Sequence, residues 1–248
     1  MKILISGICG HMGKEVEKLA LDGFRGAELV AGIDLKNDGS ASVPCADSFE
    51  EAFTGVDCIV DFSHHSCTDA LLAFAMKNKL PLVLATTGQT EEEKQAIYAA
   101  SKEIPLFFAA NFSLGVALLI ELAKKTAAVM PEAEIEIIEK HHDRKVDAPS
   151  GTALAIAEGI REVKTDAFVH NGRAGMGRRD PKEIGIHAVR MGNIVGEHEV
   201  LIGTPAQTIT LKHEAHSRAL FAEGALTAAA FLMGKPAGLY NMQSLLAL

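Results

Sequence analysis

The architecture of this chain follows from its N-terminal segment, Lys2-Ile3-Leu4-Ile5-Ser6-Gly7-Ile8-Cys9-Gly10-His11-Met12-Gly13, which continues into the helix-like residues 14–20. An apolar run typical of a β-strand is followed by glycines with Gly-x-x-Gly-x-x-Gly spacing and then by a helix. This order is typical of a dinucleotide-binding fold, because the glycines allow a tight turn and the pyrophosphate lies at the helix N-terminus. The commoner spacing is Gly-x-Gly-x-x-Gly, so a second feature has to support the prediction.

That second feature is Asp34, which follows a strand predicted over residues 28–33. It lies 21 residues beyond Gly13, the spacing at which an acidic residue binds a ribose 2′-hydroxyl. A carboxylate at this place repels a 2′-phosphate, which favours NADH as the cofactor. Lys36 is close enough to keep NADPH open as the alternative.

Strands and helices continue to alternate up to residue 112. Strands are predicted near residues 57–63, 80–85 and 105–112, with helices at 67–77 and 91–101. Repeated β-α units form a parallel sheet whose ligand-binding loops follow the carboxyl ends of the strands. We therefore expect one crevice to be lined by the loops at Phe62-Ser63, Thr86-Thr87 and Ala109 to Phe112.

The pattern changes after residue 112, where a long apolar helix over 113–130 precedes an alternating strand at 134–139. A helix at 153–163 and a Gly- and Arg-rich loop at 170–181, a candidate substrate gate, come next. Short connections between the three runs that follow predict antiparallel strands at 185–190, 195–202 and 207–213. The chain ends in a helix at 217–233 and a tail at 237–248 that packs back.

The predicted fold class is therefore α/β, with a Rossmann-type parallel-sheet nucleotide domain plus an α+β domain with a mixed sheet. The expected boundaries are residues 1–112 and 217–248 for the dinucleotide-binding domain, and residues 113–216 for the second domain.

The densest chemistry lies in the loop Glu139-Lys140-His141-His142-Asp143-Arg144-Lys145-Val146-Asp147-Ala148-Pro149-Ser150-Gly151-Thr152. Ser150 can cap the helix that follows, and the amides of Gly151 and Thr152 then face an anion at its positive end. Histidine titrates near neutral pH, and Lys145 adds a cation. The loop predicts a site for a small anion that gains or loses a proton. The alternative is a surface loop with a structural cap.

Composition limits the class of protein. The chain has 248 residues, 48% of them hydrophobic, and a net charge of -8, which argues against a nucleic-acid or membrane-surface partner. Four cysteines without a Cys-x-x-Cys pair argue against a zinc ribbon or a disulfide scaffold. No metal site is predicted, because structural roles are the simpler explanation for His187, His198 and His213. The short N-terminal apolar run is no secretion signal, so we expect a cytoplasmic protein.

Taken together, these segments closely resemble the 4-hydroxy-tetrahydrodipicolinate reductase (dihydrodipicolinate reductase) family of lysine and diaminopimelate biosynthesis. The resemblance rests on the glycine loop, Asp34, residues 85–88 and 109–113, the histidine loop at 141–152, and residues 195–198 and 215–218. It implies an NAD(P)H-dependent oxidoreductase that reduces a small dicarboxylate. It also implies a homotetramer assembled through the sheet of the second domain.

The resemblance assigns roles residue by residue. His141 and Lys145 match the proton donors, and His142, Ser150, Gly151 and Thr152 match the substrate contacts. The matching cofactor-binding positions are Gly7, Ile8, Cys9, Gly10, His11, Met12, Asp34, Ala85, Thr86, Thr87, Ala109, Ala110, Asn111 and Phe112.

Two departures from the family pattern concern the cofactor. Ala85 stands where the family commonly has glycine, and Leu35 stands where some members have an arginine for NADPH. The second departure strengthens the prediction of NADH. His64 and His65 follow a strand end and are weaker candidates for a cofactor contact.

Two alternatives to this family stay open at the level of sequence. One is another Rossmann dehydrogenase, such as an aspartate or homoserine dehydrogenase, in which the Lys145 to Thr152 turn is not expected. The other is a non-catalytic NAD(H)-binding protein, in which the histidine loop would have no chemical role.

Overall fold

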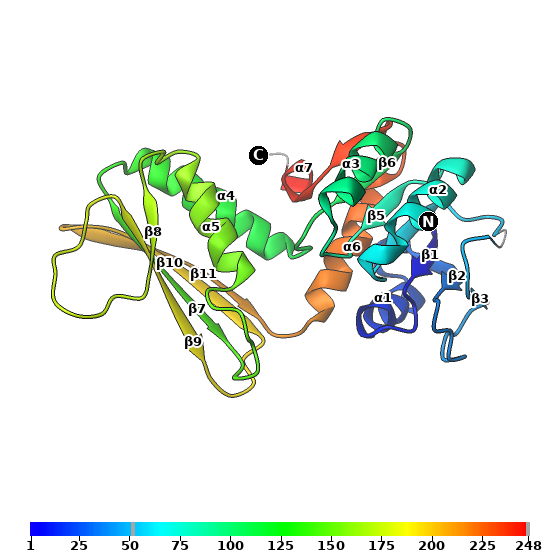
Figure 1. The fold of residues 1–248 in the computed structure, drawn as a ribbon, viewed down its shortest axis with the longest axis horizontal. Coiled ribbons are helices and arrows are strands. Elements are labelled where there is room, and N and C mark those ends of the chain that lie inside the picture. The colour runs from blue at the N-terminus through cyan, green and yellow to red at the C-terminus, as the bar shows by residue number, and fades with distance from the viewer. Residues whose placement is uncertain (51–52, 247–248) are drawn as a thin grey trace. The chain divides into compact units, whose positions relative to one another are not determined.

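The computed structural model describes residues 1–50 and 53–246, and the chain folds into two compact units (Figure 1). The first unit comprises Met1–Ser113 and Arg218–Leu248, and the second comprises Leu114–Ser217. The last two residues of the predicted C-terminal tail, 247–248, lie outside the described residues.

The first unit is built on a parallel sheet with strand order β12-β6-β5-β4-β1-β2-β3, seven strands within the described residues. Every pairing in it is parallel, which confirms the Rossmann-type prediction. The strands are β1 (Lys2–Ser6), β2 (Glu28–Ile33), β3 (Cys45–Ala46), β4 (Cys58–Asp61), β5 (Leu82–Leu84), β6 (Pro105–Phe108) and β12 (Gly238–Tyr240). The helices are α1 (His11–Leu21), η1 (Phe24–Gly26), η2 (His65–Cys67), α2 (Thr68–Asn78), α3 (Glu91–Ala100), α6 (Ala219–Leu232) and α7 (Met242–Leu246).

Both faces of this sheet are covered, which explains why its strands are apolar almost throughout. Leu4, Ile59 and Leu106 point to one face, where they form a core with side chains of α2 and α3. Alternate residues point to the other face. There Phe107 contacts Phe231 of α6, and α6 packs against α1.

The second unit is a mixed sheet with strand order β11-β10-β7-β9-β8 and two helices over one face (Figure 1). The strands are β7 (Glu134–His141), β8 (Phe168–Asn171), β9 (Glu183–Arg190), β10 (Gly196–Thr204) and β11 (Gln207–Ala215), and the helices are α4 (Leu114–Val129) and α5 (Gly151–Arg161). Along β7 every second residue is buried, and Ile135 and Ile137 join the core beneath α4 and α5. The prediction of an α+β unit with a mixed sheet is confirmed.

The predicted pairing of the last three strands is only partly right. β10 and β11 pair antiparallel as expected, but β9 is not beside β10. Instead β7 lies between them, and β9 runs parallel to both β7 and β8. Short connections favour adjacent strands, but β7 has an apolar face that must be buried in the centre of the sheet.

Two further segments contain more regular structure than the sequence predicts. The predicted loop at 170–181 begins inside β8, since His170 and Asn171 pair with β9. The C-terminal tail contains β12, which adds to the edge of the first sheet beside β6, and then α7. Both strands are short and lack a clear alternation, so periodicity could not identify them.

Candidate active site

The glycine loop between β1 and α1 is held by two close backbone approaches. Gly7 has φ +81°, and a Cβ there would lie 2.5 Å from the carbonyl oxygen of Phe62. At Gly13 a Cβ would lie 2.1 Å from the carbonyl oxygen of Gly7. Only glycine fits at either position, so α1 starts tightly against β1 with its N-terminus facing the ends of the strands.

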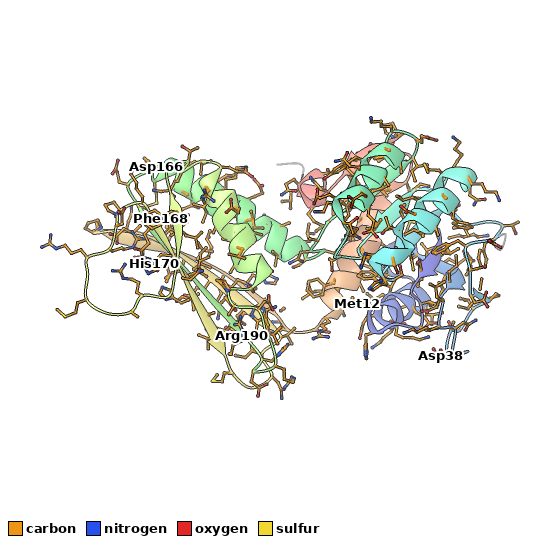
Figure 2. The ribbon with its side chains drawn as sticks, viewed as in Figure 1. Met12, Asp38, Asp166, Phe168, His170 and Arg190 are labelled. Atoms are coloured by element: carbon orange, nitrogen blue, oxygen red, sulfur yellow. The ribbon has the colours of Figure 1, made fainter. Side chains whose placement is uncertain are left out.

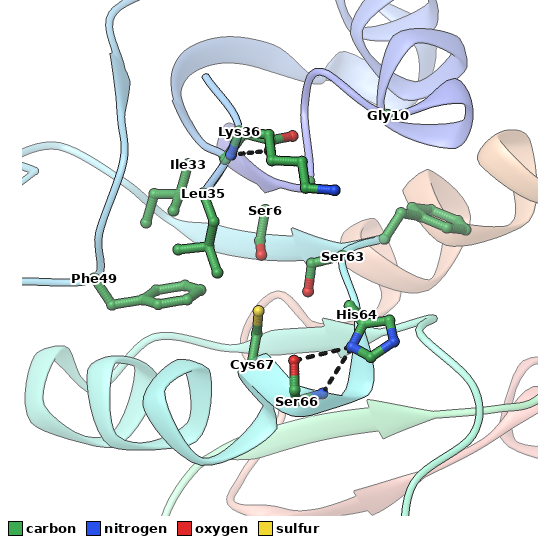
Figure 3. A pocket seen from close by; sticks show the side chains of 13 residues that line it. Ser6, Gly10, Ile33, Leu35, Lys36, Phe49, Ser63, His64, Ser66 and Cys67 are labelled. Carbon is green, nitrogen blue, oxygen red and sulfur yellow. Dashed lines mark hydrogen bonds between the residues drawn. The ribbon is translucent and has the colours of Figure 1, made fainter. Parts of the chain in front are cut away.

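Asp34, immediately after β2, is tied to this loop. Its Oδ2 accepts a hydrogen bond of 2.9 Å from the backbone N–H of Cys9, and its Oδ1 accepts one of 2.9 Å from that of Lys36. A cavity of about 460 Å³ adjoins the carboxylate. Figure 3 shows Leu35 and Lys36 on one side of this cavity and His64 and Ser66 on the opposite side.

A second cavity, of about 480 Å³, lies at the carboxyl ends of β4, β5 and β6. It is lined by side chains from all three predicted loops, as the expectation of one crevice required: Met12, Phe62, Ser63, His64, Ala85, Thr86, Thr87, Ala110, Asn111, Phe112 and Phe221. Phe62, Ser63 and His64 border both cavities, so the two are neighbours along one edge of the sheet.

The buried carboxylate of Asp61, at the end of β4, forms hydrogen bonds with two of these loops. Asp61 accepts hydrogen bonds of 2.6 Å from the hydroxyls of Ser63 and Thr86. Burial raises the pKa of this carboxyl group, and the hydroxyl donors only partly oppose that effect. Asp61 thereby joins two loops that line the second cavity.

Most of the predicted cofactor residues line one of the two cavities, but four of them line neither. Ile8 is fully buried, and its side chain packs on Gly32 in β2. Cys9 contributes its backbone N–H to Asp34, while His11 is exposed at the start of α1. Ala109 lies beside lining residue Ala110 and is half-buried. Because the side chain of Ile8 is buried, a ligand in this region can contact only the backbone atoms of Ile8.

In the second unit the histidine loop is organised around Glu139. This carboxylate is fully buried, and His141 Nδ1 lies 2.6 Å from its Oε2. Arg190 donates to both carboxylate oxygens at 2.8 Å, and the backbone N–H of Ser150 donates to Oε1 at 3.0 Å. Figure 2 labels Arg190, the last residue of β9.

The first turn of α5 is capped as predicted. Ser150 Oγ accepts the backbone N–H of Ala153 at 3.2 Å, and the same hydroxyl lies 3.0 Å from His198 Nε2. His198 is only 4% exposed, and its Nδ1 has no hydrogen-bond partner among the described residues. Burial lowers the pKa of His198 to about 4, with the nearby His141 adding to the effect, so this imidazole is neutral at pH 7.

His141 also lies in a partly desolvated place. Burial lowers its pKa, the carboxylate of Glu139 opposes this, and the cations Lys145 and Arg190 lower it further. The pKa of Glu139 is below its ordinary value, because hydrogen bonds from Arg190, His141 and Ser150 together outweigh burial. Glu139 is therefore ionised and can only accept, so His141 carries a proton on Nδ1 and exchanges its second proton at Nε2.

The remaining predicted residues of the loop surround this group. Lys145 Nζ forms an ion pair of 2.8 Å with Asp147 Oδ1, which holds the cation at the loop. His142 donates its backbone N–H to Ile194 at 2.8 Å, and its side chain is half-buried. Gly151 and Thr152 are the first two residues of α5.

Three residues of this site were missed by the sequence reasoning. Glu139 could have been found, because residues i and i+2 of a strand share a face and His141 lies two positions further on. Arg190 gave no usable signal, because it reaches Glu139 only through the unexpected pairing of β9 with β7. For His198 the sequence predicts only a structural role, but its contact with Ser150 places it at the N-terminus of α5.

The fold and these two groups of residues define the chain as a two-unit Rossmann-type oxidoreductase. The comparisons with known proteins go further. The N-terminal model of dihydrodipicolinate reductase matches residues 1–112 and the C-terminal model matches residues 115–246. The chain therefore belongs to the dihydrodipicolinate reductase family.

Individual relatives agree over nearly the full length. The chain is 46% identical to the 4-hydroxy-tetrahydrodipicolinate reductase of Caldanaerobacter subterraneus subsp. tengcongensis, covering 99% of this chain and 98% of the relative. It is 43% identical to the enzyme of Clostridium novyi, with the same coverage. The dipicolinate-bound dihydrodipicolinate reductase of Paenisporosarcina sp. TG-14 superposes with a TM-score of 0.82 at 27% identity, over 97% of each chain.

More distant structures show the fold alone. A probable dehydrogenase from Thermotoga maritima has a TM-score of 0.64 at 11% identity, over 98% of this chain and 92% of that one. In the described part of this chain, no helix has the length and apolar character that a membrane span needs.

Proposed function

We propose that this protein reduces 4-hydroxy-tetrahydrodipicolinate to tetrahydrodipicolinate with NADH or NADPH, in lysine and diaminopimelate biosynthesis. The observation that carries the proposal is the grouping of His141, Lys145 and the capped N-terminus of α5 in a chain of this family. The first unit is proposed to bind the dinucleotide, and the second, in the predicted residues 113–216, to bind substrate and to form the oligomer contacts.

The first unit has room and chemistry for a dinucleotide. Gly7 and Gly13 allow the loop to pack tightly against Phe62 and against the start of α1, and a glycine loop of this kind at a helix N-terminus suits a pyrophosphate. Asp34 faces a cavity next to that loop, and Ala85 to Thr87 with Ala110 to Phe112 line the neighbouring one. When bound, a reduced nicotinamide supplies the hydride.

The second unit supplies charge and protons. The N–H groups at the start of α5, with Lys145, bind the carboxylates of the substrate and fix its orientation. A dianion beside His141 favours the imidazolium form, which offsets the lowered pKa of the free protein. His141 then gives its Nε2 proton to the substrate, and Lys145 is the second donor.

The test measures oxidation of the reduced cofactor with freshly prepared 4-hydroxy-tetrahydrodipicolinate. His141→Ala and Lys145→Ala should each lower turnover by about a hundredfold or more, the scale for losing a positioned acid. Arg144→Ala is the control in the same loop, since its side chain is 65% exposed, and it should turn over like the wild type. Near-wild-type turnover in both test variants would refute the assignment of the acids. No oxidation by the wild type would favour a non-catalytic NAD(H)-binding protein.

NADH is the proposed preferred cofactor. Asp34 would repel a 2′-phosphate, and Leu35 offers no compensating charge beside it. Leu35→Arg should raise kcat/KM for NADPH relative to NADH by about tenfold, the scale of one charge-assisted hydrogen bond. A wild type that prefers NADPH would contradict this proposal and leave the reductase assignment intact.

A homotetramer is proposed for the assembly. β11 is an edge strand in which six of the nine residues are exposed, so its backbone can pair with another chain. Light scattering after gel filtration should give about four times 26.4 kDa.

The cytoplasmic location stays a prediction from the N-terminal sequence.

A further inference from the structure

Glu139 is a buried carboxylate with four donors on its two oxygens. They are His141 Nδ1 at 2.6 Å, two guanidinium nitrogens of Arg190 at 2.8 Å, and the backbone N–H of Ser150 at 3.0 Å. A buried charge of this kind is costly unless it is paired and hydrogen-bonded. One side chain therefore joins the proposed acid to the residue that caps the proposed substrate-binding helix.

The sheet brings these groups together by register. Glu139 and His141 lie two residues apart on β7 and so share its buried face, in line with Ile135 and Ile137. Arg190 is the register partner of His141 on the parallel strand β9. The apolar face of the sheet thus ends in a polar group at the carboxyl end of β7.

The other nitrogen of His141 lies beside Gly196, the first residue of β10. A Cβ built on Gly196 would lie 3.1 Å from His141 Nε2, closer than a side chain normally comes. Gly196 therefore leaves room at the nitrogen that exchanges the proton, while Glu139 occupies the opposite side of the ring.

The charged and titratable groups around His141 come from every element that packs near it. Glu139 on β7 is the negative group, and Arg190 on β9 and Lys145 in the following loop are positive. On β10, His198 has its ring centroid 5.2 Å from that of His141, and His213 on β11 lies beyond His198. Arg190 offsets the charge of Glu139, so the histidine does not face a lone carboxylate.

We propose that Glu139 and Arg190 are positioning residues for the reduction: Glu139 fixes His141 as the Nδ1–H tautomer with Nε2 toward the substrate, and Arg190 balances the charge of Glu139. This inference rests on the proposed function, since it assigns His141 as the acid. Without Arg190, the carboxylate would hold the proton on His141 to higher pH. Without the carboxylate, repulsion by the charges of Arg190 and Lys145 would make His141 lose its proton at lower pH.

The test is an NMR titration of the full-length protein labelled with ¹⁵N-histidine, with the His141 signals assigned by comparison with His141→Gln. Glu139→Gln should lower the titration midpoint of His141 by about one pH unit, and Arg190→Met should raise it by about as much. Arg190→Lys should restore a midpoint near that of the wild type. Loss of fold alone would not move the midpoint in opposite directions for two partners of one ion pair.

The control removes a comparable ion pair on the same strand. Arg173 donates to Glu183, a buried residue at the start of β9, at 2.8 and 2.9 Å. Arg173→Met should leave the His141 midpoint unchanged. If Arg190→Met does not fold, the double variant Glu139→Gln/Arg190→Met removes both charges and should titrate close to the wild type.

Shifts of the same sign, no shifts, or a neutral His141 protonated on Nε2 would overturn the inference. The pH profile of kcat/KM provides a second readout, in which Arg190→Met should extend activity to higher pH. If the wild type does not reduce the substrate, the proposed function is refuted. The NMR titration does not depend on turnover and tests the roles of Glu139 and Arg190 separately.

Discussion

Acid should destabilise the second unit through His198, which is buried against Ser150 and His141. Its pKa is about 4 in the folded protein, against an ordinary value of 6.5. Between these values the unfolded chain binds more protons than the folded one. The stability from the neutral imidazole is therefore fully present above about pH 6.5 and is lost as the pH falls toward 4.

The size of the effect follows from the two pKa values. At pH 5 the unfolded imidazole is nearly all protonated and the folded one is mostly neutral, which corresponds to about 2 kcal/mol. Well below pH 4 the loss reaches about 3 kcal/mol. His198→Gln removes the titration and can keep a hydrogen bond to Ser150, so the variant should lose about 2 kcal/mol less than the wild type between pH 7 and pH 5.

Urea unfolding followed by far-UV circular dichroism measures this difference, since the chain has no tryptophan to report by fluorescence. His216→Gln is the control, because it makes the same substitution at an exposed histidine of the same unit. If wild type and His198→Gln lose the same free energy of unfolding between pH 7 and pH 5, His198 is not the group responsible and the reasoning fails.

Three further predictions concern the first unit and are read out by urea unfolding. Gly13→Ala should cost about 2–3 kcal/mol because its Cβ meets the Gly7 carbonyl, whereas Gly10→Ala, with 3.2 Å to the same oxygen, should cost less; equal costs would contradict the packing argument. Asp61→Ala should cost about 2 kcal/mol by leaving the buried Thr86 hydroxyl and the half-buried Ser63 hydroxyl without their acceptor, and Asp61→Asn should recover part of it. Thr90→Ala breaks the capping box of α3 and should cost about 1 kcal/mol, an effect that a stability within 0.3 kcal/mol of wild type would rule out.

The amino-acid sequence by itself determined the features that are local in the chain. The order of strand, glycine loop and helix, the distance to Asp34 and the Ser150 cap each depend on residues close together in sequence. Backbone sterics, turn geometry and hydrophobic periodicity act over such short spans, so a single sequence is enough to predict them. They also carried the resemblance to the family that the comparisons then showed.

Only the tertiary structure decided which strands lie side by side in the second unit. Arg190 and Glu139 are 51 residues apart, and they meet because β9 runs parallel to β7 although shorter connections favoured β10. His198 reaches Ser150 across 48 residues by a similar route. Strand order depends on how apolar faces are buried over the whole sheet, a collective property that no short segment encodes.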